Sequence, residues 1–258
     1  KAGYHLTRNT RLSPGDHLRM PAEFPPIFIG GSRRCGTTLL SDLLGQHPQI
    51  SPIYETDFVL TLLEALVDVK DLPLMERLSQ FREYAFNWSK TLPHRPDREL
   101  SSQKGEYESY SHGPSYFLLT TEEFQRKTDK FIDRMQQKNN FKTVSNYLTE
   151  LFQTHCQKDE KPCWLNKTPR YVLYPETILE WFPDMIFIHA LRDPRAVVAS
   201  LKKFEWAPDT VRECALRWTK FVNSAVQFGQ IHPDNYLEVR YETLLRTPER
   251  CLRAILRN

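Results

Sequence analysis

The chain has 258 residues, with 35 Lys and Arg against 32 Asp and Glu, and 40% of its residues are hydrophobic. A chain of this length buries enough surface to be stable as one large domain or two small ones, so neither a disulfide scaffold nor a structural metal is required. The formal net charge of +3 is small and the basic residues are dispersed. This pattern argues against nucleic acid as a partner but allows a local anion site.

The sequence contains no apolar run of about 18 residues, so no membrane span is expected within this chain. It has five cysteines, which are widely spaced and include no CxxC pair. An odd number of cysteines in this arrangement makes a zinc site improbable and favours a cytoplasmic location over a secreted one. No metal site is therefore predicted.

Glycine is the most informative residue type. The chain has only nine glycines, about half the average usage of ~7%, yet Gly30, Gly31 and Gly36 fall within one short stretch. Because glycine has no side chain, it occurs where the backbone must turn sharply or come close to another group. The stretch 30–36 therefore marks a candidate binding loop.

The first half of the chain predicts an arm, a strand and several helices. Residues 1–25 are polar and rich in proline, which predicts an extended arm, and residues 26–258 are expected to form a single domain. The apolar run 27–29 predicts a buried strand, and the leucine spacing in 37–44 predicts a helix. Residues 60–160 predict a mostly helical insertion that covers the sheet edge, with helical spacing in 131–156 and an irregular segment at 93–114.

A second strand and helix follow at residues 185–203. Asp193 is a suitable N-cap, and Pro194 a suitable first helical residue. Residues 237–241 predict a third strand, ahead of a helix from about Thr247. Strands that alternate with helices predict an α/β fold with a central parallel sheet flanked by helices, and ligands bind such sheets at the carboxyl ends of the strands.

Residues 31–38 read Gly-Ser-Arg-Arg-Cys-Gly-Thr-Thr, which is the GxxxxG spacing of a phosphate-binding loop between a strand and a helix. Such a loop surrounds an anion with backbone N–H groups and adds the positive end of the helix dipole. Thr37 stands where nucleoside triphosphatases have lysine, which weakens an ATPase interpretation. Arg34 is a candidate replacement cation. The alternative interpretation is that the segment is simply a tight turn from a strand to a helix and binds no anion.

Arg192 and Ser200 follow the second strand. Their spacing of eight residues lets a cation and a hydroxyl approach one phosphate from different directions. Alone, Arg192 is equally well explained by a salt bridge at the start of the helix. Together with the first loop, a second phosphate site at the same sheet edge is the better explanation. A nucleotide with separate 5′ and 3′ phosphates would occupy both sites.

These two turns resemble those of the sulfotransferases that use 3′-phosphoadenosine 5′-phosphosulfate (PAPS). Residues 31–39 resemble the 5′-phosphosulfate loop of that family, and residues 191–195 with Ser200 resemble its 3′-phosphate motif. Residues 47–56 are similar to the branch that contains tyrosylprotein sulfotransferases. The resemblance implies a three-layer, P-loop-like fold and PAPS as the cofactor, released as adenosine 3′,5′-bisphosphate (PAP) without a metal.

The resemblance also implies roles for individual residues. Glu55 matches the catalytic base, Lys167 matches a lysine that contacts the sulfate, and Arg34 would hold further sulfate oxygens. Tyr241 matches a tyrosine near the nucleotide. The implied cofactor-binding residues are Arg33, Arg34, Cys35, Gly36, Thr37, Thr38, Arg192, Ser200 and Tyr241. Two of them depart from the family pattern, since Arg33 and Cys35 replace the usual Pro and Ser.

The implied activity is in-line transfer of a sulfuryl group from PAPS to an acceptor hydroxyl or amine. Peptidyl tyrosine, a carbohydrate and a small-molecule hydroxyl all remain open as acceptors, as do a homodimer and a Golgi-lumen location. Two rival hypotheses are a P-loop nucleotide kinase and a catalytically inactive nucleotide-binding module. His47 and His112 are alternative candidates for the base or for an acceptor-site residue, and four aromatic residues are candidates to line an acceptor pocket: Tyr107, Tyr110, Tyr116 and Phe117.

Overall fold

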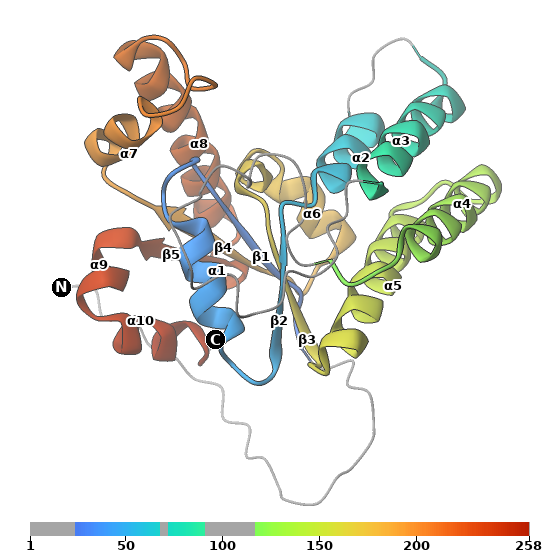
Figure 1. Ribbon diagram of the computed structural model, residues 1–258, viewed down its shortest axis with the longest axis horizontal. Helices are drawn as coiled ribbons and strands as arrows, with labels where there is room; N and C mark the ends of the chain where they lie inside the picture. Colours follow the sequence, from blue (N-terminus) through green and yellow to red (C-terminus); the bar gives the residue numbers. More distant parts are fainter. Residues whose placement is uncertain (1–23, 68–71, 91–116, 258) are drawn as a thin grey trace, which may run out of the picture.

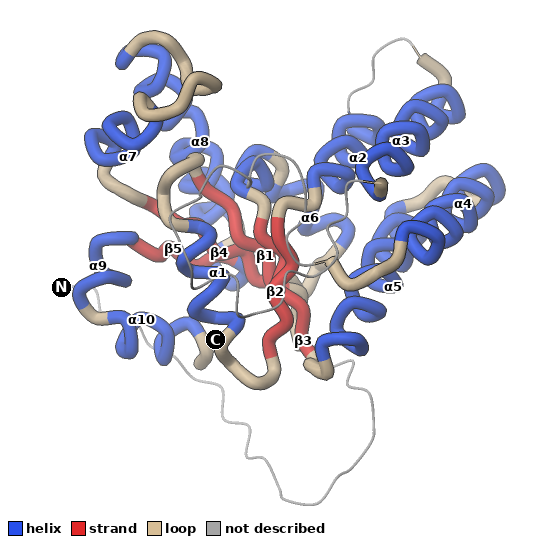
Figure 2. The backbone as a smooth tube through the Cα atoms, in the orientation of Figure 1, coloured by secondary structure: helices blue, strands red, loops and turns tan. Residues whose placement is uncertain are grey.

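The computed structural model describes residues 24–67, 72–90 and 117–257, and within them five strands form one parallel sheet (Figure 1, Figure 2). The strands are β1 (Ile27–Gly31), β2 (Ile50–Tyr54), β3 (Cys163–Lys167), β4 (Ile186–Leu191) and β5 (Tyr236–Arg240). The helices are α1 (Thr37–Gly45), α2 (Asp57–Val67), α3 (Leu74–Ser89), α4 (Thr121–Gln137), α5 (Phe141–Asp159), α6 (Pro175–Trp181), α7 (Pro194–Leu201), α8 (Val211–Ile231), α9 (Tyr241–Arg246) and α10 (Pro248–Ile255). Two 3-10 turns, η3 (Pro169–Leu173) and η4 (Pro233–Asn235), complete the described elements.

The strand order β2-β3-β1-β4-β5 puts β1 in the middle of the sheet. From β1 the chain crosses to the edge strand β2, returns to β3, and then continues through β4 and β5 on the other side of β1 (Figure 2). Ligands of open parallel sheets bind beside the carboxyl ends of the strands, where the direction of winding changes. In this protein that position lies beyond the ends of β1 and β3.

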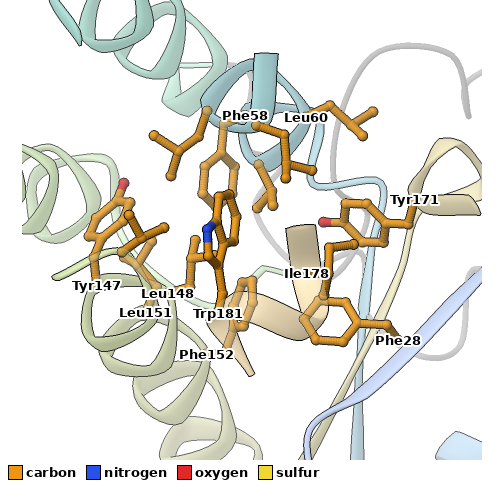
Figure 3. Packing of buried hydrophobic residues seen from close by; sticks show 14 of the residues in the cluster. Phe28, Phe58, Leu60, Tyr147, Leu148, Leu151, Phe152, Tyr171, Ile178 and Trp181 are labelled. Carbon is orange, nitrogen blue, oxygen red and sulfur yellow. The ribbon is translucent and has the colours of Figure 1, made fainter. Parts of the chain in front are cut away.

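Alternating side chains of β1 enter two separate cores, which is expected of a strand covered on both faces. Phe28 packs into a cluster with residues of α2 to α6 and α8, and Figure 3 shows part of this packing around Trp181. Ile29 packs into a second cluster with residues of α1, α7, α9 and α10. The sheet is therefore the middle of three layers, as the sequence predicted.

Within the described ranges, residues 60–160 are mostly helical, and the spacing noted in 131–156 belongs to two helices, α4 and α5. The break between α4 and α5 lies at Asn140, whose side chain accepts a hydrogen bond from the N–H of Thr143 at 2.9 Å and caps α5. The predicted N-terminal arm lies almost wholly outside the described residues, as does the irregular segment 93–114. Among the helices of the described ranges, none is long and apolar enough to cross a bilayer.

Two predicted boundaries were refined. The strand predicted at 237–241 is β5, and the helix expected from about Thr247 is preceded by α9, which begins at Tyr241. Pro248 then starts α10, because proline is favoured in the first turn of a helix. The cap at Asp193 is confirmed, since its carboxylate accepts a hydrogen bond from the N–H of Arg195 at 2.8 Å. Strands β2 and β3 were not predicted.

The packing predicts a large loss of stability when Phe28 is truncated. Its ring lies 5.4–5.6 Å from the rings of Trp164, Tyr171 and Phe182, measured between centroids. Phe28→Ala should lower the free energy of unfolding by about 3–5 kcal/mol in urea denaturation. The control is Phe141→Ala, because Phe141 is 53% exposed. This substitution should change the free energy of unfolding by less than about 0.5 kcal/mol. Equal losses would contradict this assignment of the core.

Candidate active site

All five strands end at one edge of the sheet, and a residue or loop singled out from the sequence lies at each end. The loop 32–36 follows β1, Glu55 follows β2, Lys167 ends β3, Arg192 follows β4 and Tyr241 follows β5. The parallel register explains this convergence, because neighbouring strands end at nearly the same level. The sequence-predicted residues, separated by up to about 200 positions, therefore share one edge.

The loop after β1 is a tight turn whose shape requires glycine at position 36. The N–H of Cys35 donates to the carbonyl of Ser32 at 3.2 Å, and Arg34 adopts a left-handed conformation with φ 68°. Gly36 has φ 92°, and a Cβ built on it would lie 2.3 Å from the ring of Tyr241. A side chain at position 36 would therefore clash with the first residue of α9 as well as strain the backbone.

Helix α1 begins at this loop with its positive end unneutralised. Its N-cap, Gly36, has no side chain to bond the first N–H groups, and no acidic residue lies in the first turn. The first N–H groups of a helix have no partner within it and carry part of the positive end of the dipole. Together with Arg33 and Arg34, this arrangement suits an anion.

The loop arginines contact the second turn predicted from the sequence. Arg34 donates from Nε to the Ser200 hydroxyl at 3.0 Å, and its guanidinium lies 4.7 Å from the ring centre of Phe204. Arg192 donates from Nη1 to the carbonyl of Arg34 at 3.0 Å and lies 4.3 Å from the ring centre of Tyr241. Arg34 is thus grouped with the predicted 3′-phosphate residues, and its expected catalytic role stays a prediction.

Several residues that support Arg192 were not identified from the sequence. The indole N–H of Trp218 donates to the Arg192 carbonyl at 3.2 Å, and Glu242 accepts from the N–H of Asp193 at 3.0 Å. Within the described part of the chain, Arg192 Nε is buried and lacks a hydrogen-bond partner. A buried donor of a charged group without a partner is costly, so an anionic ligand would complete this site.

Glu55 and Lys167 form the second part of the site. The Lys167 side chain is 2% exposed, and its ammonium donates to Glu55 Oε1 and, at 3.2 Å, to the Thr38 hydroxyl. It also lies 5.4 Å from the ring centre of Tyr54. Glu55 is 31% exposed, so its carboxylate connects the buried cation with the surface. This pair joins β2 and β3 to the first turn of α1.

The side chain of Cys35, one of the predicted cofactor-binding residues, packs into the core. The residue is 1% exposed and packs in the core cluster below the loop, with residues of α1 and α7. Burial raises the pKa of its thiol to about 12, so the group stays protonated near neutral pH. Any contribution of Cys35 to binding would come from the conformation of the loop.

The alternative candidates lie elsewhere or outside the described residues. His47 follows the carboxyl end of α1, away from the loop, and its Nδ1 accepts a hydrogen bond from the N–H of Gln49 at 3.3 Å. Phe117 is buried in the core with Phe58 and Trp88. Outside the described ranges lie His112, Tyr107, Tyr110 and Tyr116. Within those ranges, no group of three or more His, Cys, Asp or Glu residues could hold a metal ion.

A parallel sheet of this order, with the predicted anion loop (residues 32–36) after its central strand, defines a P-loop-like α/β protein. The chain belongs to the sulfotransferase family, because the profile described as "Sulfotransferase family" matches residues 25–258. It is 25% identical over 241 residues to a protein-tyrosine sulfotransferase of Drosophila melanogaster, a match that covers 91% of this chain. The chain spans 38% of the length of that relative.

The solved structures that are similar to this chain include two sulfotransferases. The sulfotransferase domain of the Synechococcus PCC 7002 olefin synthase has a TM-score of 0.55 and 20% identity, covering 93% of this chain and 75% of that one. A Mycobacterium avium sulfotransferase has a TM-score of 0.48 and 16% identity, covering 89% and 62%. The first similarity supports the fold assigned above.

The burial of Cys35 predicts that its thiol is inert in the folded protein. Because thiolates react with disulfide reagents and thiols do not, Cys35 should be modified by DTNB at about pH 8 only after unfolding. Cys251, which is partly buried on α10, should react first. Mass spectrometry of the modified peptides identifies each site. The opposite result would be fast modification of Cys35 in the native protein, together with protection by a bound nucleotide. That result would show that the thiol faces the predicted anion site.

Proposed function

We propose that this sulfotransferase transfers a sulfuryl group from PAPS to an acceptor hydroxyl or amine, with Glu55 as the base. The observation that supports this proposal is the Glu55–Lys167 pair, whose cation also bonds Thr38 in the first turn of α1. The pair puts a proton acceptor and a buried positive charge beside an uncapped helix N-terminus. These are the groups that a transfer reaction between an anionic donor and a hydroxyl requires.

The residues of the two turns fit a nucleotide with separate phosphate groups. The N-terminus of α1, with Thr37 and Thr38, would bind the 5′-phosphosulfate, while Arg192 and Ser200 would bind the 3′-phosphate. When bound, PAPS supplies the sulfuryl group, which passes to the acceptor oxygen as its bond to the 5′-phosphate breaks. The lysine of ATP-binding loops is replaced by Thr37, which favours this donor over a magnesium-bound triphosphate.

Glu55 and Lys167 would have different tasks. The partly exposed carboxylate of Glu55 would accept the proton that the acceptor hydroxyl loses. The buried ammonium of Lys167 would stabilise negative charge that develops on oxygens near the helix N-terminus, where the low dielectric strengthens electrostatic interactions. Because Lys167 already bonds both Glu55 and Thr38, it links the proton acceptor to the proposed donor site.

The acceptor class can be tested by comparing sulfate transfer to different acceptors. The 25% identity to a protein-tyrosine sulfotransferase supports a peptide tyrosine as the first acceptor to examine. We propose a panel of a tyrosine peptide, an oligosaccharide and a small phenol, each incubated with radiolabelled PAPS. Sulfate transfer to any of them supports the proposal. Phosphate transfer from labelled ATP with magnesium would favour the kinase hypothesis, and PAP binding without any transfer would favour an inactive module.

The proposed base predicts a separation of turnover from binding. Glu55→Gln keeps the shape of the side chain but removes the proton acceptor, so kcat should fall about 10²–10⁴-fold. The Kd for PAP, measured by calorimetry, should change less than about twofold because no role in PAP binding is proposed for Glu55. Glu160→Gln, at the C-cap of α5, is the control and should behave like wild type. Full activity of Glu55→Gln would refute the assignment.

The proposed 3′-phosphate site predicts the opposite pattern for Arg192. Arg192→Ala removes a charged hydrogen-bond donor and should weaken PAP binding about tenfold to a hundredfold. Arg195 is the matched control, since its side chain is 91% exposed and pairs with Asp193. Arg195→Ala should leave the Kd within about twofold, as expected for a surface ion pair. Equal effects of the two substitutions would argue against a specific site at Arg192.

A further inference from the structure

A buried hydrogen-bond network lies directly behind the proposed base. It consists of the side chains of Thr56, Asn166, Thr168 and Tyr171, all at most 1% exposed. The Thr56 hydroxyl donates to Asn166 Oδ1 at 3.0 Å and lies 2.6 Å from the Tyr171 hydroxyl. The Thr56 N–H donates to the Thr168 hydroxyl at 3.1 Å. We call these four residues the Thr56 network.

The donors of the network can be assigned from its geometry. A hydroxyl carries one proton, and Thr56 donates that proton to Asn166, so Tyr171 must be the donor in its contact with Thr56. Burial raises the pKa of Tyr171, which keeps this hydroxyl protonated. Three hydrogen bonds therefore meet at Thr56, which connects the end of β2 with β3 and η3.

Both groups of the proposed catalytic pair are sequence neighbours of the network. Glu55 precedes Thr56, while Lys167 lies between Asn166 and Thr168. The backbone of Glu55 is left-handed, with φ 47°, a conformation that a residue with a side chain rarely adopts. Such strain persists only where the surroundings impose it. The N–H of Glu55 donates to the Lys167 carbonyl at 2.8 Å, and the network fixes the next residue.

We propose that Thr56 is a positioning residue that holds Glu55 in its left-handed conformation and keeps its carboxylate on Lys167. The proposal rests on the proposed function, since it assigns a supporting role to a neighbour of the base. Without the Thr56 hydroxyl, residue 55 can relax toward ordinary backbone conformations, which moves the carboxylate. Thr56 itself is fully buried, so its effect on the reaction passes through Glu55.

The first experiment compares Thr56→Val, which keeps the shape of the side chain, with Thr56→Ser, which keeps the hydroxyl. Thr56→Val should lower kcat by about tenfold to a hundredfold, because small displacements of catalytic groups have effects of this size. Its Kd for PAP should stay within about twofold, since no role in PAP binding is proposed for Glu55. Thr56→Ser should recover most of the kcat. Loss of PAP affinity in parallel with kcat, or no recovery by serine, would overturn the proposal.

The second experiment measures the strain at residue 55 without using activity. Glycine tolerates a positive φ and alanine does not, so Glu55→Gly should have a higher Tm than Glu55→Ala. This difference should shrink or reverse when Thr56→Val is added, because residue 55 is then free to relax. Glu160, which has φ 58° and lies at the C-cap of α5, is the control. Its Gly–Ala difference in Tm should be the same with and without Thr56→Val.

The two proposals fail in different ways. A Gly–Ala difference at residue 55 that does not respond to Thr56→Val would overturn the positioning role, whatever the enzyme catalyses. If the wild-type chain transferred no sulfate from PAPS, the proposed function would fall, and the melting comparison would still decide whether the network imposes the conformation of Glu55.

Discussion

The burial of one cation, Lys167, is the constraint on which this site depends. An ammonium group removed from water is strongly unfavourable unless it is paired and hydrogen-bonded. Its partners come from two directions, since Glu55 follows β2 and Thr38 belongs to the first turn of α1. Satisfying this one charge therefore requires β2, β3 and α1 to meet at the same edge of the sheet, which is also where the anion loop lies.

This constraint explains why strain occurs beside it. Glu55 adopts a left-handed conformation although it is not glycine, and the cost of such a conformation is about 1–3 kcal/mol. The pairing with Lys167 and the hydrogen bonds of Thr56 offset that cost. The loop 32–36 also contains a left-handed residue with a side chain, Arg34. At Gly36 in the same loop, glycine avoids both the strain and a clash with Tyr241.

The sequence predicted the local features of the site better than its long-range contacts. The loop 31–38 and the cap at Asp193 were recognisable because turn chemistry is determined by adjacent residues. Strand β2 was not recognised, since it contains Pro52; the sheet tolerates this residue because β2 is an edge strand. The Thr56–Asn166 bond joins positions 110 apart, and no periodicity in a single sequence indicates such a pair.

The proposed roles separate binding from chemistry. The groups expected to hold the nucleotide lie on α1 and after β4 and β5, whereas the proposed base and the buried lysine lie at the ends of β2 and β3. Thr38 belongs to the first group by position and bonds to Lys167 of the second. Because this contact passes through the first turn of α1, an anion bound there would lie next to the hydrogen bonds of Lys167. The sulfate end of the proposed donor would then lie beside the same cation that pairs with Glu55.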